Sequence, residues 1–592
     1  MADRGRGSEL GRGLRAGLMA GVPHLLDEER ATVPRIVLPI TRRGLELTDR
    51  VCWVILGVAM AVAAALILYL NRGTTFFPDE IDWVYASPSL SAGDVFEPHN
   101  GHLAATTRLV YKAILETVGA EYLAFRLLGV AAVLLSAALF YALAKRRIGA
   151  LPALAPAFVL LFLGSAPVHV TSPVGFTPVF SIAAGLAALL ALERSDWRGD
   201  LAGCGLIIIS IATYTTGLAF LGGVSISVLL RPDRARRAWI FLVPLLLYAA
   251  WWLQALSSES SASGEASPFN VVLIPNWVAE SLAAVLSAIT GLGYEFAEQA
   301  VTGVSVGWGR VLAVLAVVAL VLRIRRGHLP PALWVSFGVV LTYWSLGALV
   351  AGSFSRVPEA SRFIYPGAVG LLLVATAAAQ GLRLSRLGVS VLFIAAAFSL
   401  ATNIALLADG AAQTRNVRSP EARAYFTALE LARGRVVPDF MFGPPQTTPI
   451  ESPAAAYFEA ADRYGSLAFP LPELQQQSEA VRQRADGILV SALGLRLEAS
   501  SSRQGNACVR VGVQQRRGVL SFELPRRGAS LRVRAPGPAA LTLGRFGDLP
   551  SVEVGSLSPG QLAALRIPPD ASPRPWRAAV AEAGSVEVCE LR

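Results

Sequence analysis

The sequence predicts a polytopic α-helical membrane protein of about eleven transmembrane helices, followed by an extracytoplasmic C-terminal domain that is β-rich or α+β. Hydrophobic residues make up 54% of the chain and charged residues 16%, whereas soluble domains carry about 25% charged residues. Short arginine clusters follow every second apolar segment, as in the cytoplasmic loops of membrane proteins. After about residue 486 the apolar runs are short and often alternate with polar residues, which is typical of half-buried strands.

Charge and cysteine content narrow the classes of function. The net charge is +10 and the mean hydropathy is +0.51. The arginines lie in clusters between apolar segments instead of on one soluble face, so we expect no nucleic-acid partner. The four cysteines show no CxxC or Cys/His spacing typical of a metal site. High Ala, Arg and Gly usage with few lysines points to a GC-rich bacterial genome.

Residues 1–50 form a basic segment that we expect to be cytoplasmic. It is not a cleavable signal peptide, because the polar region is long and no small-residue cleavage site follows. The first span is 51–70, about the 20 residues that a bilayer requires. Arg42, Arg43 and Arg50 precede this span, which places the N-terminus inside the cell.

The other spans follow from the same apolar pattern, which defines a transmembrane domain over 51–407. They are expected at about 122–144, 151–165, 176–192, 201–214, 217–230, 238–256, 302–322, 332–351, 363–380 and 388–407. The basic connections lie at 145–147, 194–198, 231–237, 323–326 and 383–386. Residues 201–230 could form one long helix. A break at the TYTTG stretch, 213–217, preserves the alternation of basic and polar loops and is preferred.

Two further segments have apolar residues at helical spacing. Residues 275–298 are interpreted as an amphipathic helix or helical pair on the outer surface, and 103–118 as a similar helix. Such helices would help to hold a long-tailed substrate beside the membrane. Ordinary packing on the protein surface is the alternative.

The C-terminal domain is expected over 408–592. It begins with a polar helical segment, and an odd number of spans places it outside the cell. Strand-like runs occur at 487–493, 508–513, 520–524, 530–535 and 585–591. An extracytoplasmic location would permit a disulfide between Cys508 and Cys589.

The first outer loop, 71–121, is the candidate catalytic centre. It contains five carboxylates and two of the five histidines of the chain, namely Asp79, Glu80, Asp82, Asp94, Glu97, His99 and His102. Sugar transfer to a hydroxyl requires a carboxylate that accepts the proton and a group that stabilises the departing phosphate. Asp79 and Glu80 are the candidate catalytic residues, and Asp82 is a candidate substrate contact. The alternative is a solvated loop in which Asp79 caps a helix.

His99 and His102 form a second cluster within this loop. Histidines at this spacing can bind a metal or orient a substrate phosphate. We therefore include both as candidate substrate-binding residues. A divalent cation held by Glu80, His99 and His102 is the one candidate cofactor. Surface histidines without a ligand are the alternative.

Three short motifs resemble membrane glycosyltransferases of the GT-C fold, in particular the protein O-mannosyltransferase and aminoarabinose-transferase relatives. Asp79-Glu80 matches the paired acids that open the first outer loop of these families. Residues 122–127 (YLAFRL) resemble the arginine-leucine opening of their second span. Residues 361–366 (SRFIYP) are similar to their Ser-Arg-Tyr-Xaa-Tyr-Pro stretch, with Phe363 in place of a tyrosine. The resemblance covers about 50–410.

The resemblance implies a polyprenyl-phosphate sugar donor and Asp79 as the general base. It also adds Arg126, Arg362 and Tyr365 as candidate substrate-binding residues. The two arginines are candidates because a guanidinium group binds phosphate bidentately. Pairing with nearby acids or extension of the side chain toward the aqueous edge is the alternative for Arg126.

The expected activity is therefore transfer of a sugar, hexose or pentose, from a polyprenyl-phosphate donor to an extracytoplasmic glycan, lipid or protein. The expected location is the inner or plasma membrane of a bacterium, with a role in the cell envelope. The main alternative is a transporter or flippase of a lipid-linked or envelope substrate. A glycan polymerase or ligase without the GT-C fold is a further alternative, although such proteins tend to place their main loop late in the chain.

Overall fold

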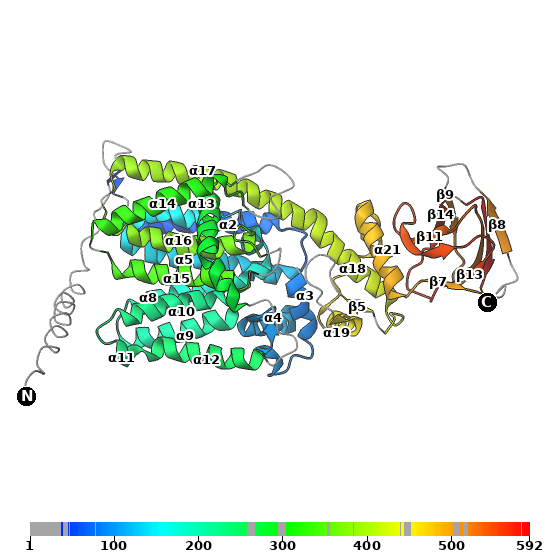
Figure 1. Ribbon diagram of the computed structural model, residues 1–592, viewed down its shortest axis with the longest axis horizontal. Coiled ribbons are helices and arrows are strands. Elements are labelled where there is room, and N and C mark those ends of the chain that lie inside the picture. The colour runs from blue at the N-terminus through cyan, green and yellow to red at the C-terminus, as the bar shows by residue number, and fades with distance from the viewer. Residues whose placement is uncertain are drawn as a thin grey trace, which may run out of the picture.

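The computed structural model describes residues 37–38, 45–46, 48–76, 78–256, 267–293, 304–327, 329–351, 356–382, 384–438, 440–442, 452–500, 508–512, 519–581 and 583–591. A bundle of long helices and a smaller C-terminal domain lie at opposite ends of an elongated molecule (Figure 1). The expected combination of a polytopic helical region with a C-terminal domain that contains strands is confirmed.

Each predicted span coincides with a helix of the bundle. These helices are α2 (Asp49–Leu70), α5 (Tyr122–Ile148), α6 (Ala150–Leu161), α8 (Phe176–Leu192), α9 (Trp197–Thr213), α10 (Thr216–Leu229), α12 (Trp239–Ala255), α14 (Gly307–Arg325), α15 (Pro331–Leu349), α16 (Ser361–Ala378) and α17 (Arg386–Gln413). Shorter elements between them are β1 (Val37–Leu38), β2 (Leu45–Glu46), α7 (Pro167–Thr171), η2 (Pro173–Gly175), α11 (Arg234–Arg237), η4 (Pro268–Leu273) and α13 (Ile274–Thr290). Within the described ranges, nine helical segments are long and apolar enough to cross a membrane. One of these, Pro268–Thr290, was not among the predicted spans.

The predicted break within 201–230 is confirmed. Tyr214 has an extended backbone, with φ −165° and ψ 157°, so α9 ends before it and α10 begins shortly after it. The Thr216 hydroxyl donates a hydrogen bond to Ser181 Oγ of α8 at 2.8 Å. A Cβ on Gly217 would lie 2.5 Å from the backbone nitrogen of Ile211, so only glycine fits this tight reversal.

The predicted amphipathic segment 275–298 contains the single helix α13. In Figure 1, α13 runs across the direction of α8 and α9. The side chain of Asn403 in α17 donates to the carbonyl oxygen of Ala288 at 3.0 Å. A Cβ on Gly309 of α14 would lie 2.0 Å from the carbonyl oxygen of Ala283, so small residues allow close packing there. The last residues of the predicted segment lie outside the described ones.

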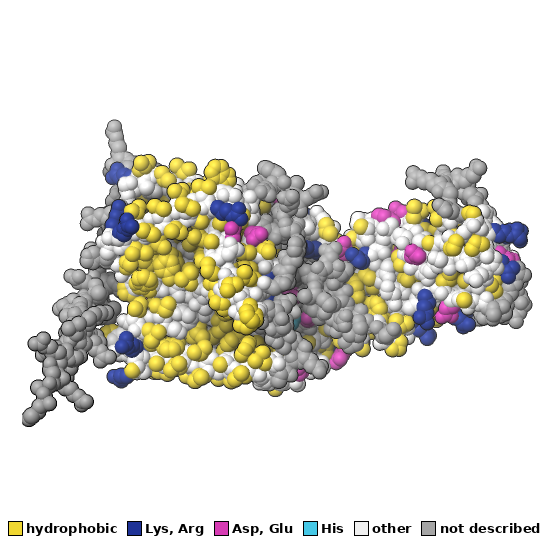
Figure 2. Space-filling model, viewed as in Figure 1, with side chains coloured by type: hydrophobic (Ala, Val, Ile, Leu, Met, Phe, Trp, Pro, Cys, Tyr) yellow, Lys and Arg dark blue, Asp and Glu magenta, His cyan; other side chains and the backbone are white. Residues whose placement is uncertain are grey.

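The surface of the bundle separates apolar from basic residues. Hydrophobic side chains cover much of the visible side of the bundle, and Lys and Arg gather at the end farthest from the C-terminal domain (Figure 2). At this end Lys145 forms an ion pair with Asp49 at 2.9 Å, and Arg147 donates to the carbonyl oxygen of Leu373 at 3.0 Å. Basic connections at one end are what a cytoplasmic side requires. The orientation of the termini across a membrane stays a prediction.

A continuous helix links the bundle to the C-terminal domain. From α17 it passes through the π-helical turn η5 (Thr414–Arg418) into α18 (Ser419–Ala432). The helical run Arg386–Leu431 has 46 residues and, at about 1.5 Å per residue, spans roughly 69 Å. The predicted domain boundary between 407 and 408 lies within α17. The two regions are therefore joined by a helix instead of a loop.

The C-terminal domain contains two antiparallel sheets. Strand order in the larger is β7 (Leu497–Ala499), β13 (Leu562–Arg566), β10 (Gly528–Arg534), β15 (Ser585–Glu590) and β8 (Cys508–Gly512). In the smaller it is β12 (Val552–Leu557), β11 (Ala539–Gly544), β14 (Arg577–Ala581) and β9 (Val519–Glu523). The remaining elements are β5 (Met441–Phe442), β6 (Ser452–Pro453), α19 (Ala454–Tyr464), α20 (Leu471–Gln475) and α21 (Glu479–Ala492). Burial alternates along β9, as expected for strands with one buried face.

Most of the predicted strands are confirmed, and one is wrong. The runs that begin at residues 508, 520, 530 and 585 lie in or overlap β8, β9, β10 and β15. The run 487–493 instead lies in α21, where Ile488, Leu489 and Val490 are buried. A short apolar run fits a buried helix as well as a strand, and here the helical residues that precede it decide the outcome.

The predicted pairing of Cys508 with Cys589 is also confirmed. The two cysteines are register partners in the β8–β15 ladder and form a disulfide. Cys52 and Cys204 are free and buried within the bundle.

Removal of this disulfide should destabilise the C-terminal domain by about 2–4 kcal/mol, because it closes a long loop in the unfolded chain. The sequence separation of the two cysteines is 81. A Cys508→Ser/Cys589→Ser variant should therefore show a lower midpoint of thermal unfolding for this domain. As a matched control, Cys52→Ser/Cys204→Ser protein, unfolded without reductant, should take up no thiol label. Labelling of that control would contradict the pairing.

Candidate active site

The first outer loop folds into a compact unit against the bundle. It consists of α3 (Pro78–Ala86), the 3-10 helix η1 (Asp94–Phe96), the hairpin of β3 (Pro98–His99) and β4 (His102–Leu103), and α4 (Ala105–Val118). The hairpin turns at Asn100-Gly101, where both residues have positive φ, 50° and 76°. The expected amphipathic helix at 103–118 is thus α4, whose buried face includes Thr107, Tyr111 and Leu115.

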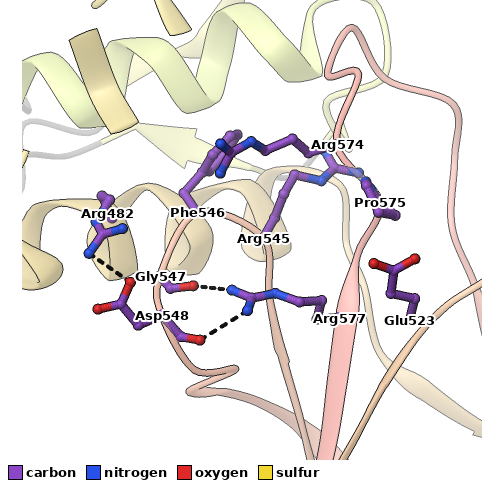
Figure 3. A pocket seen from close by; sticks show the side chains of 9 residues that line it. All are labelled: Arg482, Glu523, Arg545, Phe546, Gly547, Asp548, Arg574, Pro575 and Arg577. Carbon is purple, nitrogen blue, oxygen red and sulfur yellow. Dashed lines mark hydrogen bonds and ion pairs between the residues drawn. The ribbon is translucent and has the colours of Figure 1, made fainter. Parts of the chain in front are cut away.

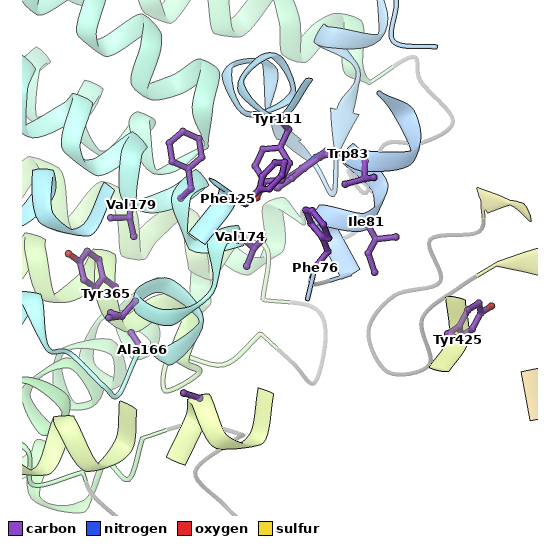
Figure 4. Close-up of a cluster of buried hydrophobic side chains, with 14 of the residues drawn as sticks. Phe76, Ile81, Trp83, Tyr111, Phe125, Ala166, Val174, Val179, Tyr365 and Tyr425 are labelled. Carbon is purple, nitrogen blue, oxygen red and sulfur yellow. The ribbon is translucent and has the colours of Figure 1, made fainter. Parts of the chain in front are cut away.

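Aromatic side chains hold this unit on the bundle. The ring centroids of Trp83 and Tyr111 are 4.9 Å apart, and those of Tyr111 and Phe125 are 4.8 Å apart. Phe76 lies 5.0 Å from Phe125, so a continuous cluster joins α3, α4 and α5 (Figure 4). Edge-to-face aromatic contacts of this kind add specific geometry to apolar burial.

The adjacent acids Asp79 and Glu80 face different surroundings. Successive residues of a helix point about 100° apart, so the two carboxylates cannot share one side of α3. Glu80 is fully buried and accepts hydrogen bonds from the hydroxyls of Tyr111 at 2.7 Å and Tyr122 at 3.2 Å. Asp79 is only partly buried, and its Oδ1 lies 3.4 Å from the side-chain nitrogen of Asn100.

The Glu80 network connects three helices. Burial, followed by the Glu80 charge and hydrogen bond, raises the pKa of Tyr111 well above its usual range. This phenol therefore remains protonated and donates to the carboxylate. Because Glu80 lies on α3, Tyr111 on α4 and Tyr122 on α5, the network fixes the rotation of α3 and with it the direction of Asp79.

Asp82 and His99 form a contact that is neutral near pH 7. His99 Nδ1 lies 3.9 Å from Asp82 Oδ2. Burial, reinforced by Asp79, raises the pKa of Asp82 to about 8, while burial, reinforced by Arg108, lowers the pKa of His99 to about 4. Neither side chain carries its charge at neutral pH. The pair can accordingly exchange hydrogen bonds with an uncharged ligand such as a sugar hydroxyl.

His102 faces the break between α9 and α10. Its Nδ1 is 2.8 Å from Thr215 Oγ1, and its ring lies 4.2 Å from the ring of Tyr214. Burial lowers the pKa of His102 to about 3, with contributions from His99 and the arginines described next. The same break that separates the two spans thus brings polar groups of the bundle onto the hairpin.

Two arginines, Arg356 and Arg362, act electrostatically on residues of the loop. Arg362, in the first turn of α16, is exposed and has no hydrogen bond or ion pair within the described part of the chain. Its charge opposes the effect of burial, which raises the pKa of Asp79. Arg356 and Arg362 both act electrostatically on His102 and on Tyr214. Asp79, His102, Tyr214 and the two arginines therefore belong to one site at the end of the bundle nearer the C-terminal domain.

Tyr365 lies one helical turn beyond Arg362 and is fully buried. Its ring stacks on that of His169, with centroids 6.1 Å apart. Among the described residues, neither the Tyr365 hydroxyl nor His169 Nδ1 has a hydrogen-bond partner. Burial, reinforced by Arg362, lowers the pKa of His169 to about 4. His169 therefore borders the site.

Arg126 has a partner within the protein. Its Nη1 donates to the carbonyl oxygen of Asn71 at 2.8 Å, and its guanidinium lies 5.9 Å from the ring centroid of Tyr122. These contacts tie α5 to the end of α2. A substrate contact of Arg126 stays a prediction.

The candidate metal ligands Glu80, His99 and His102 do not converge. Glu80 is directed at two tyrosines, and His102 at Thr215. Within the described ranges, the one group of three metal-binding side chains that meet is Cys508, Glu587 and Cys589, and its cysteines form the disulfide. The residues present at the loop therefore do not fit a cation held by this set.

Sequence patterns alone do not single out Asn100, Tyr111 or Thr215 as site residues. Two signals were available. Asn-Gly is typical of a two-residue hairpin turn, which brings Asn100 back onto α3. The polar break in the 201–230 segment places Thr215 near a membrane edge, where polar groups are tolerated.

The C-terminal domain packs against helices α3 and α4 of the loop. The ring of Tyr85 on α3 lies 6.4 Å from Phe426 and 5.7 Å from Tyr457. Glu116 of α4 pairs with Arg463 at 2.8 Å and accepts a hydrogen bond from Tyr464 at 3.0 Å. The helices that carry the candidate site are thus packed between the bundle and the C-terminal domain.

Comparison with known proteins gives structural neighbours only. No protein family and no curated protein matches the chain. Among solved structures, the chain resembles ArnT from Cupriavidus metallidurans bound to undecaprenyl phosphate, with 15% identity and a TM-score of 0.42 over 70% of this chain and 84% of ArnT. For ArnT in the apo state the identity is 13% and the TM-score 0.44, over 72% of this chain and 91% of ArnT.

The Glu80 network should be important for stability. Tyr111→Phe removes one donor from a buried carboxylate and should cost about 1–3 kcal/mol of the free energy of unfolding. Tyr365→Phe is the matched control, because this tyrosine is equally buried but its hydroxyl has no partner among the described residues. Thermal unfolding of the purified variants in detergent measures the difference. Equal effects of the two substitutions would contradict the role given to the network.

Asp82 should make stability depend on pH. Its folded pKa of about 8 lies above the ordinary value of 3.8, so the wild type loses stability relative to Asp82→Asn as the pH rises between these values. We expect the unfolding midpoint of Asp82→Asn, minus that of wild type, to increase from about pH 5 to about pH 8.5. Asp94→Asn is the control, since a hydrogen bond from Ser91 lowers the pKa of Asp94, and its difference should stay flat over this range. A flat difference for Asp82→Asn would refute the assignment.

Proposed function

We propose that this protein is a membrane glycosyltransferase that moves a sugar from a polyprenyl-phosphate donor to an extracytoplasmic acceptor. The observation that carries the proposal is the electrostatic effect of Arg362 on Asp79. A partly buried carboxylate and an arginine without an ion pair among the described residues act on each other electrostatically at one end of an apolar bundle. The reaction needs both groups, a base for the acceptor hydroxyl and a cation for the phosphate.

Asp79 would serve as the general base. The acceptor oxygen attacks the anomeric carbon, the bond between that carbon and the phosphate oxygen breaks, and the hydroxyl proton passes to the Asp79 carboxylate. The charge of Arg362 favours the ionised form of Asp79 against the effect of burial. Burial raises the pKa of Asp79 and thereby makes its carboxylate a stronger proton acceptor.

Arg362 would hold the donor. The departing group is a polyprenyl phosphate, which regains the electron pair and must be stabilised as an anion. An exposed guanidinium at the start of α16 can bind phosphate oxygens bidentately, and the helix N-terminus adds a favourable partial charge. The polyprenyl chain would lie along the apolar surface of the bundle.

The remaining loop residues would orient the sugar and acceptor. The neutral pair of Asp82 and His99, together with His102, offers hydrogen-bonding groups without a net charge at neutral pH. Glu80 would act as a positioning residue, because both of its oxygens accept from tyrosines. Hexose and pentose are both compatible with these groups, as is a glycan, lipid or protein acceptor.

A transporter or flippase is the second candidate. It would share the phosphate contact at Arg362 but would have no use for a base. Transporters tend to place charged residues and broken helices near the middle of the membrane. The charged groups of the candidate site instead lie at one end of the bundle, in the loop and in the first turn of α16. This favours the transferase.

Asp79→Asn should lower the rate of sugar transfer by about 10²–10⁴, the usual contribution of a positioned proton acceptor, while the protein remains folded. The measurement is mass spectrometry of envelope glycans, lipids and proteins from a deletion strain complemented with wild type or variant. Transfer in vesicles at matched protein levels gives the rate. Asp94→Asn, at a partly exposed acid of the same loop, should retain activity.

Arg362→Ala tests the phosphate contact, which both candidate functions share, and Asp79→Asn separates the two functions. In a transferase Arg362→Ala should raise the KM for the lipid-linked donor more than it lowers kcat. Wild-type transfer by Asp79→Asn would refute the base assignment. If Asp79→Asn also translocated a lipid-linked sugar across vesicles at the wild-type rate, the protein would be a transporter instead of a transferase.

A further inference from the structure

A second candidate site lies in the C-terminal domain, where α21 meets the four-stranded sheet. A cavity of about 360 Å³ opens there, within the range of about 300–1,000 Å³ typical of small-molecule sites. Its lining residues come from α21, the end of β9, the 545–548 turn after β11, and the start of β14. None belongs to the membrane bundle, so the cavity is separate from the candidate active site.

The wall of the cavity is a turn held rigidly against α21. The buried carboxylate of Asp486 accepts hydrogen bonds from three successive backbone nitrogens, those of Arg545, Phe546 and Gly547, at 2.9–3.1 Å. A Cβ on Gly547 would lie 3.0 Å from Cγ of Gln483, so this close approach favours glycine. The turn is therefore fixed before any ligand binds.

Arg545 lines the cavity and is buried. Its side chain is 4% exposed, and its Nη1 pairs with both oxygens of Asp570 at 2.8 and 2.9 Å. Within the described residues, the buried Nε atoms of Arg545 and of Arg482 have no hydrogen-bond partner. These two guanidinium groups therefore place fixed positive charge at the cavity wall, which favours an anionic ligand.

Two further side chains that line the cavity, Arg574 and Glu523, are exposed, so a ligand can contact them. Arg574 makes no side-chain hydrogen bond or ion pair with the described part of the chain. Glu523, at the end of β9, is exposed and stands opposite Arg577 in the β9–β14 register. Arg577 itself donates to the backbone oxygens of Gly547 and Asp548. In Figure 3, Glu523 and Arg482 lie at opposite sides of the cavity.

We infer that this cavity binds a small anion that also carries hydroxyl groups, such as a sugar phosphate or a sugar acid. Arg574 would hold the phosphate or carboxylate, because a guanidinium group matches such oxyanions, and Arg482, Arg545 and Arg577 add positive charge to the lining. Glu523 would accept hydrogen bonds from the hydroxyls. The charged lining excludes an apolar lipid tail. The inference does not depend on the activity proposed for the membrane region.

The test uses the full-length protein in lipid nanodiscs, with Arg362→Ala in every sample so that phosphate binding at the membrane site is reduced. Glucose 6-phosphate, glucuronate, inorganic phosphate and glucose are titrated by calorimetry. We expect saturable binding of glucose 6-phosphate or glucuronate, and the tighter of the two tells whether phosphate or carboxylate is the preferred anion. Glucose should bind at least about tenfold more weakly, since a hydrogen bond to a charged group contributes about that factor or more.

Arg574→Ala should weaken binding of the anionic sugar by about tenfold or more. Glu523→Gln should weaken the anionic sugar but leave inorganic phosphate unchanged. Arg526→Ala, at an exposed arginine of the same domain that does not line the cavity, is the matched control and should bind as the parent does. Absence of saturable binding, equal binding by Arg574→Ala, or equal binding by Glu523→Gln would each overturn the inference.

Discussion

The buried carboxylate of Glu80 determines how the candidate active site is oriented. It accepts hydrogen bonds from Tyr111 and Tyr122, so helix α3 is held to α4 and α5 at one rotation. A buried carboxylate is costly unless it is hydrogen-bonded, which leaves α3 no equally stable alternative. Asp79, the neighbouring residue, is consequently directed toward Asn100 and Arg362. One acid is thus used to orient the helix, and the other remains available for chemistry.

Burial then separates the charge states of the groups around Asp79. Asp82 and His99 are both driven toward their neutral forms, whereas Arg362 keeps its charge at an exposed position. A site with the Asp79 carboxylate, two arginines and several neutral donors and acceptors suits a substrate that combines a phosphate with hydroxyl groups. If Asp82 were also ionised beside Asp79, the two negative charges would repel each other and the phosphate.

The C-terminal domain packs against the helices that carry the candidate active site. The long helix from α17 to α18 brings it to the loop, and Tyr85 packs against Phe426 and Tyr457. The pair of Glu116 with Arg463 adds a polar contact at the edge. Because α3 is covered on this side too, displacement of the C-terminal domain would expose the helix that carries Asp79. The domain therefore supports the site as well as presenting a cavity of its own.

The sequence predicted the spans and the acidic loop, because hydropathy and arginine clusters are local properties. It identified Asp79 and Glu80 together but could not separate them, since only packing against Tyr111 and Tyr122 sets the rotation of α3. Likewise, 487–493 is equally apolar as strand or helix, and its contacts made it part of α21. The encounter of Asp79 with Arg362 joins segments far apart in the chain. Tertiary structure decided these points, because each depends on which distant surfaces exclude water from one another.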